Sequence, residues 1–121
     1  MTPEGQVLAQ ILDYLKARGV FAFRQNTGAG KLTDGARHTS RFVRFGFPGC
    51  ADILGCLDDG RFLAIECKAP TGRITQEQAA FLDDIRRRGG KAFVARSAED
   101  VERELYHPSA WILQKRREVM P

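Results

Sequence analysis

Residues 51–68 read ADILGCLDDGRFLAIECK, and they contain the clearest hairpin pattern of the chain. Two apolar runs flank the turn sequence Asp58-Asp59-Gly60, which predicts strands at 51–57 and 61–68 joined by a three-residue hairpin loop. Apolar residues occupy both faces of these strands, as expected for central strands that are covered on each side. The stretch therefore predicts the middle of a sheet with helices packed on both faces.

The length of the hairpin loop sets the register of the two strands. It places Asp52 opposite Glu66, and Lys68 shares their face because it lies two residues beyond Glu66. Two opposed carboxylates repel each other, and one lysine can neutralise only one of them. The pattern predicts a divalent cation between Asp52 and Glu66. The alternative is a salt bridge of Lys68 with either acid, exposed at the strand ends.

Two helices are expected to bring further polar groups to this face. The first begins at Thr2-Pro3 and runs to about residue 18, with Glu4 on its inward apolar stripe. Another opens with Thr75-x-x-Gln78 and carries Gln78 on its inward stripe. Each residue has a purely structural alternative: Glu4 as a favourable charge at a helix N-terminus, and Gln78 as part of a capping box.

The remaining elements complete an α/β pattern. Further strands are predicted at 20–24, 41–45 and 91–96, and a short last helix from Ser97 to about Tyr106. Residues 26–40 are rich in glycine, threonine and basic residues, which predicts a long exposed loop. We expect one domain over residues 1–121, with a mixed sheet flanked by helices in the order α-β-β-β-α-β-α.

Composition and cysteine content restrict the class of protein. The chain has 121 residues, 43% of them hydrophobic, and no apolar run long enough to span a bilayer or to act as a secretory signal. Its three cysteines, Cys50, Cys56 and Cys67, are odd in number and lack C-x-x-C spacing. We therefore expect three buried thiols in a reducing cytoplasm, with neither a disulfide nor a zinc site.

Basic residues gather in particular segments. The formal net charge is +4, and between residues 16 and 44 Asp34 is the only acid. Residues 107–121 form a basic C-terminal tail. This distribution favours contact with nucleic acid, and the alternative is a solvated basic face. The residues expected to grip the phosphate backbone are Arg24, Lys31, Arg37, Arg41 and Arg44.

An ordered set of motifs resembles a known superfamily. Gly49-Cys50-Ala51-Asp52, then Glu66-Cys67-Lys68, then Gln78 on the following helix are similar to the PD-(D/E)XK nucleases, and most similar to the stand-alone VRR-NUC domains, the virus-type replication and repair nucleases. The shared order of elements covers nearly the whole chain. Ala51 stands where the superfamily name has proline, and Cys67 stands where an aliphatic residue is commoner. Neither position is a side-chain ligand.

The resemblance implies a restriction-endonuclease-like core and a role for each motif residue. Asp52 would be the metal-bridging carboxylate, Glu66 the second ligand, and the backbone carbonyl of Cys67 a third. Lys68 would orient or activate the attacking water. Glu4 would hold the metal or its water, and Gln78 would position Lys68 or nearby backbone.

The resemblance also implies an activity. We expect a Mg²⁺- (or Mn²⁺-) dependent endonuclease that hydrolyses phosphodiester bonds in branched DNA such as four-way junctions. We further expect a homodimer without a small-molecule cofactor, acting in the cytoplasm of a bacterial or phage-infected cell. The alternatives are a non-catalytic nucleic-acid-binding module and an accessory subunit that docks an acidic partner.

Overall fold

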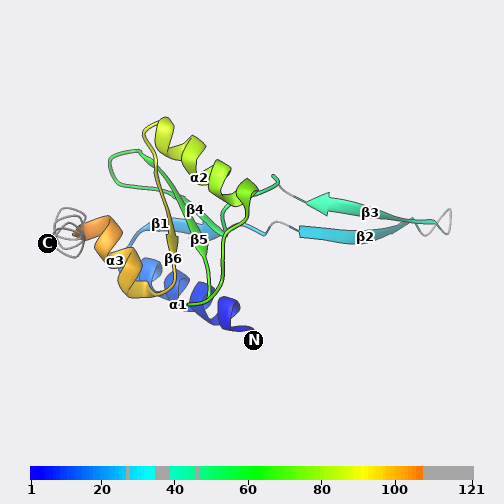
Figure 1. The fold of residues 1–121 in the computed structure, drawn as a ribbon, viewed down its shortest axis with the longest axis horizontal. Coiled ribbons are helices and arrows are strands. Elements are labelled where there is room, and N and C mark those ends of the chain that lie inside the picture. Colours follow the sequence, from blue (N-terminus) through cyan, green and yellow to red (C-terminus); the bar gives the residue numbers. More distant parts are fainter. Residues whose placement is uncertain (27, 35–38, 46, 108–121) are drawn as a thin grey trace, which may run out of the picture.

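A four-stranded mixed sheet forms the centre of the molecule in the computed structural model (Figure 1). The structure describes the backbone of residues 1–26, 28–34, 39–45 and 47–107, and the side chains of residues 1–26 and 47–107. The elements in chain order are α1 (Pro3–Ala17), β1 (Phe21–Arg24), β2 (Gly28–Asp34), β3 (Thr39–Phe45), β4 (Ile53–Cys56), β5 (Phe62–Cys67), α2 (Gln76–Arg87), β6 (Lys91–Ala95) and α3 (Ala98–Tyr106).

The strand order in this sheet is β1-β4-β5-β6. β1 and β5 both pair antiparallel with β4, whereas β6 pairs parallel with β5 after the α2 crossover. With its helices, the sheet has the predicted order α-β-β-β-α-β-α and is consistent with a restriction-endonuclease-like fold. The predicted hairpin register is confirmed, because Ile53 lies opposite Ile65 and Cys56 opposite Phe62.

Each helix begins where its capping residues predict. Thr2 accepts a hydrogen bond from the Gly5 amide at 3.0 Å, and Pro3 occupies the first helical position of α1. Thr75 and Gln78 form the reciprocal capping box of α2. Ser97 caps α3 by accepting from the Asp100 amide.

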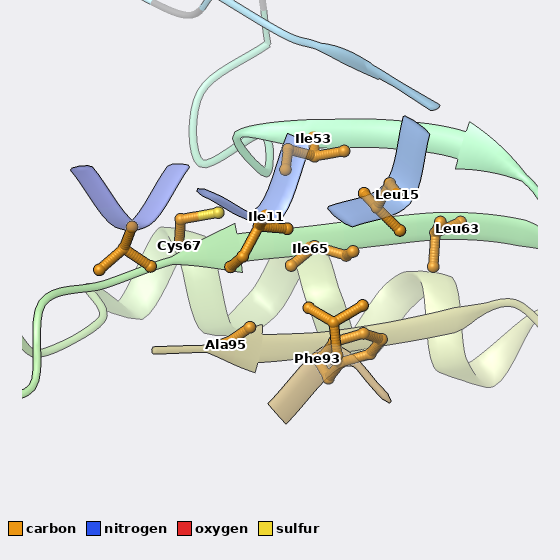
Figure 2. Close-up of a cluster of buried hydrophobic side chains, with 10 residues drawn as sticks. Ile11, Leu15, Ile53, Leu63, Ile65, Cys67, Phe93 and Ala95 are labelled. Atoms are coloured by element: carbon orange, nitrogen blue, oxygen red, sulfur yellow. The ribbon is translucent and has the colours of Figure 1, made fainter. Parts of the chain in front are cut away.

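Two apolar layers sandwich the sheet. The larger layer joins α1 and α3 to one face of the strands, and Figure 2 shows Ile11 and Leu15 of α1 above Ile65 and Phe93. The smaller layer places Leu82 of α2 on the other face, against alanines of the sheet. Because β4 and β5 are covered in this way, their ends are held rigidly, and the acidic residues lie at those ends.

The prediction of a loop over residues 26–40 is wrong. Residues 28–34 form β2, which pairs antiparallel with β3, and Figure 1 shows this hairpin extending away from the four-stranded sheet. The strand expected at 41–45 is confirmed as β3, although its partner is β2. Pairing satisfies the backbone hydrogen-bonding groups along the facing edges of the two strands. The two glycines of β2 have low strand propensity, so the sequence pattern did not indicate this strand.

The expected burial of all three cysteines is also wrong. Cys67 is buried, Cys50 is intermediate and Cys56 is exposed. Cys56 is exposed because α2 covers β5 and β6 and leaves the β1–β4 side of that face open. Among the described residues, no helix is both long and apolar enough to cross a membrane.

Candidate metal centre

The acidic residues meet at one edge of the sheet, where β4 begins and β5 ends. Asp52 and Glu66 are the next opposed pair beyond Ile53 and Ile65. The Asp52 carbonyl accepts a hydrogen bond from the Gln25 amide at 2.6 Å, so the chain leaving β1 is secured at this edge. Three strands therefore fix the backbone on which these carboxylates stand.

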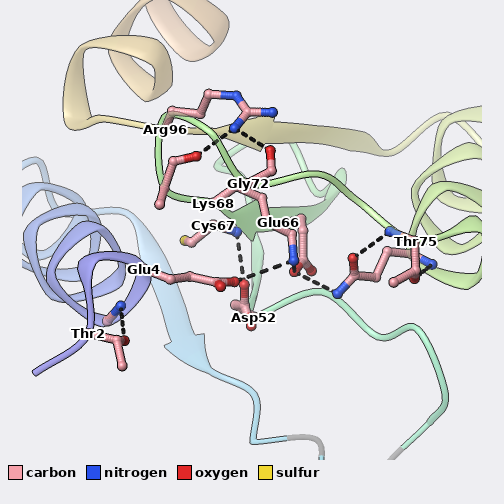
Figure 3. Close-up of polar contacts among 12 residues, drawn as sticks. Thr2, Glu4, Asp52, Glu66, Cys67, Lys68, Gly72, Thr75 and Arg96 are labelled. Atoms are coloured by element: carbon pink, nitrogen blue, oxygen red, sulfur yellow. Dashed lines mark hydrogen bonds and ion pairs between the residues drawn. The ribbon is translucent and has the colours of Figure 1, made fainter.

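Asp52 is oriented by a backbone donor. Its Oδ2 accepts a hydrogen bond from the Cys67 amide at 2.9 Å, across the strand pair (Figure 3). One oxygen is thus engaged with the neighbouring strand, and the carboxylate is directed toward Glu66. The predicted pairing of these two acids is what the structure shows.

Glu66 is the most constrained acid of the site. The residue is only 2% exposed. Its Oε1 accepts a hydrogen bond from Gln78 Nε2 at 3.0 Å, while Oε2 is buried and has no hydrogen-bond partner among the described residues. Burial, and then the nearby Asp52 carboxyl, raise the pKa of Glu66 from 4.5 to about 8. An oxygen of this kind favours either a proton or a cation.

Lys68 supplies the positive charge of the site. Its Nζ lies 3.4 Å from Glu4 Oε1 and 3.7 Å from Glu66 Oε1, and its side chain is 11% exposed. The alternative of a solvent-exposed salt bridge at the strand ends is therefore wrong, since Lys68 and Glu66 are both buried. One ammonium faces three carboxyl groups, so acidic groups exceed basic ones here.

Glu4 and Gln78 come from helices on opposite faces of the sheet. Glu4, in the first turn of α1, is 48% exposed and reaches Lys68 from the solvent side. Gln78 forms the predicted capping box and also reaches the site, where its partner is the Glu66 carboxylate and not the Lys68 side chain or backbone that the resemblance implied. Gln78 Oε1 accepts from the Thr75 amide at 2.9 Å in the capping box, and its Nε2 donates to Glu66. The start of α2 is thereby tied to the buried carboxylate.

The arrangement fits a hard divalent cation. Glu4, Asp52 and Glu66 each offer a carboxylate oxygen, and these oxygens lie within 4.8 Å of one another. Oxygens around a bound Mg²⁺ are about 3.0 Å apart when adjacent and about 4.2 Å apart when opposite, so the three carboxylates would close in on the ion as it binds. The donor set contains only oxygen, which suits Mg²⁺ or Mn²⁺. The buried, unpartnered oxygen of Glu66 supports the same assignment.

Cys67 contributes its backbone to the site. Its thiol lies in the apolar layer beneath α1, and burial raises the pKa of this thiol. The Cys67 amide holds Asp52, as described above, while a role of its carbonyl as a metal ligand stays a prediction. Successive side chains of a strand point to opposite faces of the sheet, so Cys67 can belong to the core although both of its neighbours are charged.

The expected DNA-binding residues occupy the adjoining segments. Arg24 is exposed at the end of β1, one residue before Gln25 and its bond to Asp52. Lys31 lies on β2, and Arg41 and Arg44 lie on β3. Arg37 and the basic tail beyond residue 107 lie outside the described residues. Contact of any of these residues with nucleic acid stays a prediction.

Arg96 is a site residue that the sequence did not indicate. It follows β6 and donates from Nη1 to the carbonyls of Ala69 at 2.6 Å and Gly72 at 2.7 Å (Figure 3). Those carbonyls belong to the loop that leaves Lys68 and leads to α2. A single arginine after a strand carries no pattern, so only the folded structure reveals this clamp.

The comparisons with known proteins agree with this geometry. A family model described as the VRR-NUC domain matches residues 3–99, a range that contains every acidic, basic and amide group of the site. This chain belongs to the VRR-NUC domain family. Membership in the VRR-NUC domain family implies nuclease activity, and the acidic cluster fits a divalent metal. No curated protein matches the chain at a significant level.

Proposed function

We propose that this VRR-NUC chain is a Mg²⁺- or Mn²⁺-dependent DNA endonuclease that selects branched DNA, such as a four-way junction. The observation that carries the proposal is the buried Glu66, whose Oε2 has no described partner while the Glu4 and Asp52 carboxylates lie beside it. Burying a carboxylate oxygen without a partner costs several kcal/mol in lost hydration, and a bound cation would offset this cost. A purely structural salt bridge would not need the second and third acids.

The residues of the site would divide the work between them. Asp52, Glu66 and Glu4 would hold the metal, which when bound supplies Lewis-acid polarisation of the phosphate and lowers the pKa of an attacking water. Lys68 places its ammonium beside Glu66, where it can stabilise negative charge that develops on the phosphate. Gln78 fixes the rotamer of Glu66 through its hydrogen bond, and Arg96 holds the loop that follows Lys68.

Recognition of DNA would rest on the basic segments. The β2–β3 hairpin extends from the sheet near the acidic edge and carries Lys31, Arg41 and Arg44, while Arg24 is exposed at that edge. Contacts of this kind bind the phosphate backbone without reading sequence and weaken as salt concentration rises. Selection by DNA shape follows more naturally from such contacts than selection by sequence.

A homodimer would supply two active sites to a branched substrate, and one surface supports this part of the proposal. β1 is an edge strand of the four-stranded sheet, and its Phe21 and Phe23 are 69% and 49% exposed. Free strand edges with apolar side chains favour pairing with another chain.

The odd number of cysteines and the lack of C-x-x-C spacing support a further proposal, that the protein acts in a reducing cytoplasm.

A cleavage panel tests the proposed activity. End-labelled four-way junction, flap, linear duplex and single strand are incubated with the protein in Mg²⁺, Mn²⁺ or EDTA. We expect metal-dependent cleavage of the branched substrates that is abolished by Glu66→Gln, with binding in EDTA retained. Glu99→Gln, which alters an exposed carboxylate at the start of α3, is the matched control and should cut normally.

The same panel distinguishes the alternatives. Salt-dependent DNA binding without cleavage in either metal would indicate a non-catalytic binding module. The absence of both binding and cleavage would indicate an accessory subunit with a protein partner. Either result would overturn the proposed activity.

A further inference from the structure

An exposed aromatic residue packs on α2, the helix that carries Gln78. Phe47 lies in the turn between β3 and Asp52, and 67% of its surface is exposed. A large apolar ring left in water loses roughly 25 cal/mol for each square ångström that could have been buried. Contact of this exposed ring with a bound substrate would therefore stabilise the complex.

The backbone of Phe47 is held firmly. Its carbonyl accepts a hydrogen bond from the Cys50 amide at 3.0 Å, which closes the turn. Gly49 in this turn has a φ of 77°, and a Cβ there would lie 2.5 Å from the carbonyl oxygen of Glu77 in α2. The turn is thus pressed against the first turn of the helix that carries Gln78.

Among the residues whose side chains the structure describes, the ring of Phe47 packs against one other ring, that of Phe81. Its centroid lies 6.1 Å from that of Phe81, with an interplanar angle of 53°. Phe81 follows Gln78 by three residues, so both lie on the same side of α2. The apolar contact places the Phe47 ring one helical turn from Gln78, and 67% of the residue remains open to solvent.

Other exposed aromatic side chains lie elsewhere in the described structure. Phe21 and Phe23 belong to the edge strand β1, Phe62 begins β5 at the end remote from Glu66, and Tyr106 ends α3. Phe47 differs from them because its turn leads directly into Asp52, five residues later. Aromatic side chains in such positions stack on unpaired nucleic-acid bases, each of which has a flat apolar face.

We propose that Phe47 stacks on an unpaired or unstacked base next to the scissile phosphate, and that this contact makes the enzyme prefer branched over linear DNA. This inference rests on the proposed function, since it names the feature of the substrate that the same site selects. Bases in a continuous duplex are already stacked on their neighbours and gain nothing from the ring. Bases at a branch point can be exposed at small cost.

The test uses a pair of substitutions and two substrates. Phe47→Leu keeps an apolar contact with Phe81 and removes the aromatic face, and Phe47→Trp enlarges that face. Phe62→Leu, at an exposed phenylalanine on the remote end of β5, is the matched control. Cleavage in Mg²⁺ is measured on a labelled four-way junction and on a linear duplex of the same sequence. Phe47→Leu is expected to slow junction cleavage about 10-fold and to leave duplex cleavage unchanged.

A binding measurement separates this inference from the proposed activity. A junction with 2-aminopurine at the branch point is titrated with protein in Ca²⁺, and stacking on a ring quenches its fluorescence. Quenching by the wild type, Phe47→Trp and Phe62→Leu but not by Phe47→Leu supports the inference, even if the protein cuts no substrate. Equal quenching by Phe47→Leu, or an equal loss of cleavage on junction and duplex, would overturn it.

Discussion

Replacing Glu66 by glutamine should stabilise the metal-free protein at alkaline pH. The carboxyl group is 2% exposed, its Oε2 has no described partner, and the Asp52 carboxyl lies beside it. Glutamine has nearly the same shape and carries no charge. Its side-chain oxygen can still accept the hydrogen bond from Gln78, and its amide can donate to Asp52.

The size of the effect follows from the pKa of Glu66, which burial and then Asp52 raise from 4.5 to about 8. Between these values the folded protein binds a proton that the unfolded chain has released, so stability falls as pH rises through this interval. Each pH unit of this interval corresponds to about 1.36 kcal/mol, so the free energy of unfolding falls by at most about 5 kcal/mol. The pKa already includes the favourable charge of Lys68, and water that enters the site when Glu66 ionises reduces the loss further, so we expect about 2 kcal/mol, or about 8 °C in melting temperature.

Thermal unfolding in EDTA, followed by circular dichroism from pH 4 to pH 9, measures this difference. The wild type and Glu66→Gln should melt alike below pH 4.5, and the variant should melt higher above pH 8. Glu99→Gln serves as the exposed control and should follow the wild type at every pH. Parallel curves for the wild type and Glu66→Gln would contradict this expectation, because they would mean that ionisation of the Glu66 carboxyl does not destabilise the folded protein.

Further outcomes follow from the same structure. Mg²⁺ at roughly 100-fold above its Kd should raise the melting temperature of the wild type by about 10 °C in a thermal scan, and that of Glu66→Gln much less. Lys68→Met should slow cleavage by roughly 100-fold or more in a single-turnover assay while DNA binding in EDTA persists. Gly49→Ala should lower the free energy of unfolding, measured with urea, by about 2 kcal/mol, because a Cβ would collide with the Glu77 backbone at a positive φ. Replacing Arg41 and Arg44 by alanine should reduce the slope of log Kd against log salt concentration by about 0.9 per arginine in fluorescence-anisotropy titrations.

The central part of the site could be predicted from the sequence because strand geometry has a fixed period. The hairpin loop at Asp58-Asp59-Gly60 sets the register, and the register alone places Asp52 opposite Glu66. Gln78 shows the limit of such reasoning. The sequence offered capping and site contact as alternatives, yet the side chain has an oxygen and an amide and makes both contacts at once.

Other features depended on tertiary packing that leaves no local pattern. The contact of Glu4 with Lys68 requires α1 to lie at a particular height along the sheet, which its apolar stripe does not specify. The glycines of β2 carry no strand signal, and the pairing with β3 that forms this strand is visible only in the structure. Arg96 bonds to backbone carbonyls more than twenty residues away, which no spacing rule anticipates.

The groups of the metal centre come from positions 4, 52, 66, 68 and 78, carried by one helix from each side of the sheet and by the strand ends between them. A nascent chain must therefore emerge through most of its length before these groups can meet, and undocking of either helix removes one of them. Hydrolysis of nucleic acid is thereby tied to completed folding. Truncated or heat-damaged copies are expected to be harmless to the genome of the cell that makes them.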